Sequence, residues 1–116
     1  MKVDFSALPE STIEQLVLEY LAGLGIGFFW KNTSGGFHDG KRWRVHQSPF
    51  AIRGTSDILG IVGGRFIALE VKTDKGRPTS EQVAFLKKVQ DCGGLSAVVR
   101  SVDQTASILE SWGLVG

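Results

Sequence analysis

Two apolar segments joined by a pair of glycines, within Gly54–Lys72, constrain the fold of this 116-residue chain more than any other feature. Residues 57–62 and 65–72 have the composition of strands, and Gly63-Gly64 between them is the signal for a two-residue hairpin turn. Both faces of these strands carry apolar side chains, which is typical of strands that are covered on both sides. The sequence therefore predicts a β-hairpin inside a covered sheet.

Three charged residues fall at the open end of this predicted hairpin. A turn centred on Gly63-Gly64 places Asp57 directly opposite Glu70, and directly opposed residues have Cβ atoms roughly 4.5–5.5 Å apart. Lys72 follows two residues after Glu70 and so projects from the same face. Adjacent carboxylates repel unless they share a proton or bind a cation, and their oxygens suit Mg²⁺ or Mn²⁺.

This arrangement favours metal-assisted phosphodiester hydrolysis. An ordinary hairpin end, solvated and with Lys72 as an ion-pair partner, has the same spacing and is the alternative. The apolar character of both faces favours the first interpretation, because charges are costly in a covered sheet unless they are paired or bind a metal.

The composition indicates one globular domain over residues 1–116. Apolar residues make up 42% of the chain and charged residues 22%. No apolar run approaches the roughly 20 residues that cross a membrane, and the first residues lack the layout of a signal peptide. We therefore expect a cytoplasmic protein that does not associate with a membrane. The single cysteine, Cys92, excludes an intrachain disulfide framework and a cysteine zinc site.

Basic residues are concentrated immediately before the hairpin. Residues 31–53 carry five basic side chains against one acidic side chain, whereas the whole chain has a formal net charge of +1. A basic surface beside an acidic metal site suits a phosphate-backbone substrate, although a solvated basic loop has the same composition. The candidates for DNA-backbone contacts are Lys31, Lys41, Arg42, Arg44, Arg53, Lys75 and Arg77. Trp43 and Phe50 could stack on unpaired bases, but burial is the simpler expectation for each.

The remaining segments predict an α/β fold in the order helix, three strands, helix, strand, helix. Capping-box patterns at Ser11–Glu14 and Thr79–Gln82 predict the starts of two helices, and Asp103 is expected to cap the last one. Further strands are expected over residues 28–32 and 95–101, with a short one near residues 43–46. The second helix should connect two parallel strands.

The αβββαβ order, with Asp57 followed by Glu70-Val71-Lys72, resembles the PD-(D/E)XK nuclease superfamily. Within it, the chain resembles the VRR-NUC (virus-type replication-repair nuclease) group. The segments that carry this second resemblance are Lys31-Asn32-Thr33, Gly54-Thr55-Ser56-Asp57-Ile58, Glu70-Val71-Lys72-Thr73, Gly76-Arg77 and Gln82-Val83-Ala84-Phe85-Leu86. The resemblance covers about Glu14 to Ser101. Ser56 departs from it, because the superfamily name has a proline before the aspartate.

The resemblance implies a restriction-endonuclease-like core with a mixed four-stranded sheet flanked by helices. It implies that Asp57, Glu70 and the backbone carbonyl of Val71 hold Mg²⁺ or Mn²⁺. It also implies that Lys72 orients the attacking water or helps to deprotonate it. Glu14 would approach the metal directly or through water.

Gln82 resembles the glutamine that supports the lysine or the substrate in these nucleases. Glu14 and Gln82 are also the fourth residues of the two capping-box patterns, so each is expected to be a helix cap, a site residue or both.

The implied function is a homodimeric, metal-dependent DNA endonuclease selective for branched DNA such as flaps and four-way (Holliday) junctions. Its setting would be replication, recombination or repair, including in a virus or phage. Two alternatives stay open: a non-catalytic nucleic-acid-binding or dimerisation module on the same fold, and a nuclease directed at RNA. The chain has all three of Asp57, Glu70 and Lys72, which favours a catalytic protein over the non-catalytic module. The choice between DNA and RNA stays open, because nothing in the sequence indicates recognition of the 2′-hydroxyl of RNA.

Overall fold

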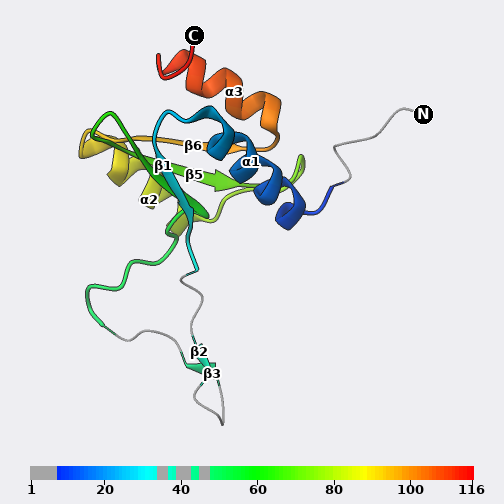
Figure 1. The fold of residues 1–116 in the computed structure, drawn as a ribbon. Coiled ribbons are helices and arrows are strands. Elements are labelled where there is room, and N and C mark those ends of the chain that lie inside the picture. Colours follow the sequence, from blue (N-terminus) through cyan, green and yellow to red (C-terminus); the bar gives the residue numbers. More distant parts are fainter. Residues whose placement is uncertain (1–7, 34–36, 39–42, 45–47) are drawn as a thin grey trace.

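The computed structural model describes residues 8–33, 37–38, 43–44 and 48–116, with the backbone alone described at 37–38 and 43–44. Within these residues the helices are α1 (Glu10–Leu24), α2 (Ser80–Asp91) and α3 (Val102–Ser111). The main sheet has the order β1-β4-β5-β6, formed by β1 (Phe28–Lys31), β4 (Ile58–Val62), β5 (Arg65–Val71) and β6 (Leu95–Val99). A second, two-stranded sheet pairs β2 (Phe37–His38) with β3 (Trp43–Arg44). The predicted α/β class and mixed four-stranded sheet are confirmed (Figure 1).

The β4–β5 hairpin has the predicted turn and register. Gly63 and Gly64 have φ angles of 57° and 82°, the positive values that a tight hairpin turn requires. β4 pairs antiparallel with β5, with Ile58 opposite Leu69. β6 then pairs parallel with β5, so the connection through α2 is the predicted parallel crossover.

Helices cover the two faces of the sheet unequally. α1 and α3 lie on one face and α2 lies on the other (Figure 1). The larger core cluster joins residues of α1, α3 and the sheet: Ile13, Val17, Leu21, Ile58, Val62, Ile67, Leu69, Val71, Val99 and Leu109. The smaller cluster under α2 is formed by Ala68, Leu86 and Val89. Burial of the hairpin on both faces is therefore confirmed at its centre.

The same prediction is wrong at the turn end of the hairpin. Ile61 and Phe66 are 45% and 36% exposed, although they are large apolar side chains. Among the described helices, α2 packs against β5 and β6 and makes no comparable contact with β1 or β4 on this face, whereas α1 packs against β1 from the other face (Figure 1).

The predicted capping box at Ser11–Glu14 is wrong. α1 begins one residue earlier, with Pro9 in the N-cap position and no side-chain cap. The amides of Thr12 and Ile13 donate to the carbonyl of Pro9 at 3.1 Å, so Ser11 already lies inside the first helical turn. Glu14 is thereby released from a capping role.

The other two helix starts give one confirmation and one correction. The amide of Gln82 donates to Thr79 Oγ1 at 3.1 Å, and the Gln82 side chain accepts from the amide of Thr79 at 2.8 Å. This reciprocal pair is the predicted capping box of α2. In α3 the cap is Ser101, whose hydroxyl accepts from the amide of Gln104, and not Asp103. None of the described helices is both long and apolar enough to cross a membrane.

Candidate metal and catalytic site

Asp57 and Glu70 meet at the open end of the hairpin, as the register predicts. Ile58 pairs with Leu69, and extending the register by one residue brings Asp57 opposite Glu70. The Asp57 carboxylate is held in place because its Oδ2 accepts from the amide of Val71 at 2.8 Å. Its backbone carbonyl accepts from the amide of Asn32, which continues the pairing between β4 and β1. Strands on both sides therefore fix the position of this carboxylate.

Glu70 is a buried acid with an unsatisfied oxygen. Only 1% of its surface is exposed, and its Oε2 has no hydrogen-bond partner among the residues that the structure describes. Burial, followed by the neighbouring charge of Asp57, raises the pKa of Glu70 from 4.5 to about 8, against the opposing effect of Lys72. Burial and the charge of Asp57 thus favour the protonated form of this carboxyl group, whereas Lys72 favours its charged form. The site therefore has the electrostatics of a pair that shares a proton or binds a metal.

Lys72 supplies the positive charge of the site. Its Nζ lies 3.6 Å from Glu70 Oε1, and only 12% of its side chain is exposed. Its amide donates to the carbonyl of Val99 at 3.0 Å, which extends the pairing of β5 with β6 past the end of the strand. The ion pair that the alternative of an ordinary hairpin end expected is present, but both of its partners are largely buried and not solvated.

Glu14 reaches the same end of the sheet from α1. It is 9% exposed, and its Oε1 lies 3.5 Å from Lys31 Nζ. Burial raises the pKa of Glu14, Lys31 lowers it and the nearby charge of Asp57 raises it again. Asp57 is therefore near enough to affect the pKa of Glu14, although within the described residues these acids do not form a three-residue metal-binding group. The direct or water-mediated contact of Glu14 with a metal stays a prediction.

Gln82 is placed beside the segment that leads into Asp57. Gly54 has a φ of 78°, and a Cβ atom on it would lie 2.6 Å from the amide nitrogen of Gln82. Only glycine can approach the first turn of α2 this closely in this conformation. The capping role of Gln82 is confirmed, whereas its predicted support of Lys72 or the substrate stays a prediction.

Ser56 is a feature that the sequence analysis did not assign to the site. It is fully buried, and its Oγ has no hydrogen-bond partner. Buried hydroxyl groups without partners are rare and call for an explanation. The burial of Ser56 could have been predicted from the alternation of side chains along a strand, because Ser56 is two residues before Ile58 and so shares its buried face.

The basic residues are divided between described and undescribed parts of the chain. Lys31, Arg53, Lys75 and Arg77 are exposed, as contacts with a phosphate backbone require. Lys41 and Arg42 lie outside the described residues, as does the side chain of Arg44.

The two aromatic residues of the basic segment have different outcomes. The expected burial of Phe50 is wrong, because it is 89% exposed. The side chain of Trp43 lies outside the described part.

The residues present fit a hard divalent cation. Mg²⁺ is commonly bound by one or two carboxylates, with its other ligands supplied by water and substrate phosphates. The Asp57–Glu70 pair offers two carboxylates, and the unsatisfied Oε2 of Glu70 is a free ligand atom. No group of three His, Cys, Asp or Glu side chains within the described ranges could hold a metal. The candidate is therefore a two-carboxylate site.

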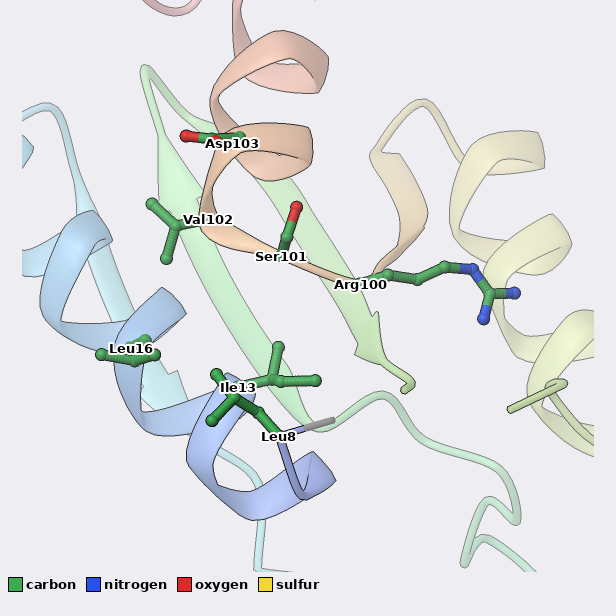
Figure 2. Close-up of a pocket in the computed structure, with 7 residues that line it drawn as sticks. All are labelled: Leu8, Ile13, Leu16, Arg100, Ser101, Val102 and Asp103. Atoms are coloured by element: carbon green, nitrogen blue, oxygen red, sulfur yellow. The ribbon is translucent and has the colours of Figure 1, made fainter. Parts of the chain in front are cut away.

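A cavity of about 290 Å³ lies elsewhere, between the start of α1 and the start of α3. Its lining is mainly apolar and includes Leu8, Ile13, Leu16 and Val102 (Figure 2). It contains none of the predicted site residues. The cavity is therefore no part of the candidate site.

Comparison with models of known protein families gives no match for this chain, and neither does comparison with curated protein sequences. The proposed function below therefore depends on the motifs quoted above and on the geometry of the site.

Proposed function

We propose that this chain is a divalent-metal-dependent DNA endonuclease that acts on branched DNA. The observation that carries the proposal is the buried Glu70, opposite the part-buried Asp57 and with Lys72 beside it, at the open end of a hairpin. Burying a carboxyl group beside a second one is costly unless it is paired, protonated or bound to a cation, and such perturbed groups are concentrated at functional sites. The VRR-NUC resemblance supplies the reaction class and, with it, the homodimer.

Asp57, Glu70 and the carbonyl of Val71 would hold Mg²⁺ or Mn²⁺ in this proposal. When bound, such an ion neutralises charge on the scissile phosphate and makes water easier to deprotonate. Lys72 orients the attacking water and stabilises negative charge that develops on the phosphate. Because its side chain is mostly shielded from water, this charge is screened less than that of a surface lysine.

The exposed basic side chains would position the DNA. Lys75 and Arg77 lie shortly after β5, the strand that carries Glu70, and Arg53 precedes Asp57 by four residues. Contacts with phosphates fix the register of a duplex and carry no sequence information. Such contacts suit recognition of the shape of a substrate, and the resemblance to the VRR-NUC group supplies branched DNA as the proposed class.

The test is cleavage by the purified protein in Mg²⁺, Mn²⁺ or EDTA. The substrates are linear duplex, flap and four-way junction DNA, each with an RNA counterpart. Asp57→Asn is the inactive variant, because it keeps a side-chain acceptor for the Val71 amide but weakens metal binding. Asp91→Asn is the matched control, because Asp91 is an exposed residue of α2 paired with Lys87.

We expect metal-dependent cutting of branched DNA that Asp57→Asn loses and Asp91→Asn retains. Binding of junctions without cutting in any metal would favour the non-catalytic module. Preferential cutting of the RNA counterparts would favour the RNA-directed nuclease. Sedimentation of the same samples tests the homodimer.

A further inference from the structure

Arg100 makes a contact that the proposed roles leave unexplained. It follows β6 directly, beside the end of β5 that carries Lys72. One guanidinium nitrogen, Nη1, donates to the carbonyl oxygens of Thr73 and Gly76, each at 2.6 Å. Figure 2 shows the side chain extending away from the apolar residues Leu8, Ile13 and Leu16. Arg100 therefore lies at the edge of the cavity beside α1, whereas its guanidinium group binds the segment that follows β5.

Residues 73–76 form a closed turn immediately after Lys72. The amide of Gly76 donates to both the carbonyl and the hydroxyl of Thr73, each at 3.1 Å. The carbonyl of Asp74 is a third, more distant acceptor of Arg100 Nη1 at 3.4 Å. Charge-assisted hydrogen bonds such as the two short ones of Arg100 are the strong ones. Arg100 thus fixes the conformation of a turn that would otherwise depend on one backbone amide.

This turn folds back beside the base of the Lys72 side chain. A Cβ atom added to Gly76 would lie 3.6 Å from the Cβ of Lys72 and 3.0 Å from Thr73 Oγ1. The backbone of Gly76, whose carbonyl Arg100 holds, is therefore a near neighbour of the point where the Lys72 side chain begins. Past the turn the chain presents the basic side chains of Lys75 and Arg77 and then enters the cap of α2 at Thr79.

We propose that Arg100 is a positioning residue for Lys72, acting through the turn at residues 73–76. The inference rests on the proposed nuclease function and deepens it. The carboxylates do not depend on this turn, because Asp57 is held by the amide of Val71 and Glu70 lies within β5. Loss of Arg100 therefore displaces the lysine and leaves the metal ligands in place.

The test compares Arg100→Ala, Arg100→Lys and the wild type in single-turnover cleavage of saturating branched DNA. We expect Arg100→Ala to lower the rate by about tenfold to a hundredfold, because misplacement by about 1 Å has effects of that size. The Mg²⁺ concentration for half-maximal rate should stay within about twofold, since the metal ligands are intact. Added methylguanidinium should restore part of the rate of Arg100→Ala, and Arg100→Lys should be intermediate, because an ammonium lacks the planar donor geometry of guanidinium.

Arg65→Ala is the matched control, because Arg65 is an exposed arginine at the opposite end of β5 and should keep the wild-type rate. Thermal unfolding of every variant identifies any that do not fold, in which case Arg100→Lys carries the comparison. If the wild type is active and Arg100→Ala has the same rate, the role of Arg100 is wrong but the proposed function stands. The same conclusion follows if Arg100→Ala loses rate that methylguanidinium does not restore. A wild type that cuts no nucleic acid would overturn the proposed function and the inference with it.

Discussion

The two ends of the β4–β5 hairpin reverse the usual distribution of polar and apolar residues. At the turn end, Phe28, Ile61 and Phe66 lie in one row across β1, β4 and β5 and are 66%, 45% and 36% exposed. At the open end, Glu70 is 1% exposed and Ser56 is fully buried. Burial in this sheet therefore follows the positions of the covering helices and not the polarity of the residues.

The gradient along the row has a simple cause. Exposure decreases from the edge strand β1 to β5, toward the strands against which α2 packs. The open end is enclosed differently, since α1 brings Glu14 to it and Gly54 docks on the first turn of α2. Enclosure of a polar end lowers the local dielectric and strengthens every charge interaction there. The difference between the ends is thus the difference between an incompletely covered core and an enclosed group of charged residues.

The largest expected effect is on activity at the open end. Glu70→Gln should lower the cleavage rate by a factor of about 10³ or more, because a metal ligand worth several kcal/mol in the transition state is lost. Thermal unfolding of the same variant shows whether it stays folded, because the change also removes the ion-pair partner of the largely buried Lys72. Rate measurements and thermal scans on one preparation test both parts. If Glu70→Gln keeps its activity, the open end of the hairpin is not a catalytic site, and a loss of activity that only follows unfolding does not support one.

The next effect is a pH dependence of stability that comes from the open end. The pKa of Glu70 is raised to about 8, above its ordinary value of 4.5, so between these values the folded chain holds a proton that the unfolded chain has lost. Its contribution to stability is therefore fully present below pH 4.5 and is lost as the pH rises to about 8. Without metal, the unfolding temperature of the wild type should fall between pH 5 and pH 8 by at least about 4 °C more than that of Glu70→Gln.

Magnesium sharpens the same experiment, because the metal competes with the proton for one carboxyl group. Added Mg²⁺ should raise the unfolding temperature of the wild type more at pH 8 than at pH 5.5, and should have little effect on Glu70→Gln. Parallel curves for the two proteins across this range would show that Glu70 titrates normally. The paired carboxylates would then be an ordinary ion-pair network.

The sequence predicts those parts of the molecule that depend on local signals. The Gly63-Gly64 turn sets the register, and the register alone brings Asp57 opposite Glu70. The first capping pattern misleads, because Pro9 already begins α1 and Glu14 is free to face the sheet. Arg100 has no local signal at all, since its carbonyl partners lie 27 and 24 residues away in the chain. Contacts between residues this far apart in the sequence depend on how β6 packs beside β5, and a short sequence pattern does not contain that information.

The smallest expected effects are changes in the free energy of unfolding, which should differ between the two faces of the hairpin. Ile58 is fully buried under α1, and Ile61 is nearly half exposed on the opposite face. Replacing each with valine removes one methylene group and preserves the β-branched side chain, so strand preference is matched. We expect Ile58→Val to lower the free energy of unfolding by about 0.5–1.5 kcal/mol, whereas Ile61→Val should stay within about 0.5 kcal/mol of the wild type. Urea titrations resolve this difference, and equal losses would mean that another surface covers the row of Phe28, Ile61 and Phe66 in solution.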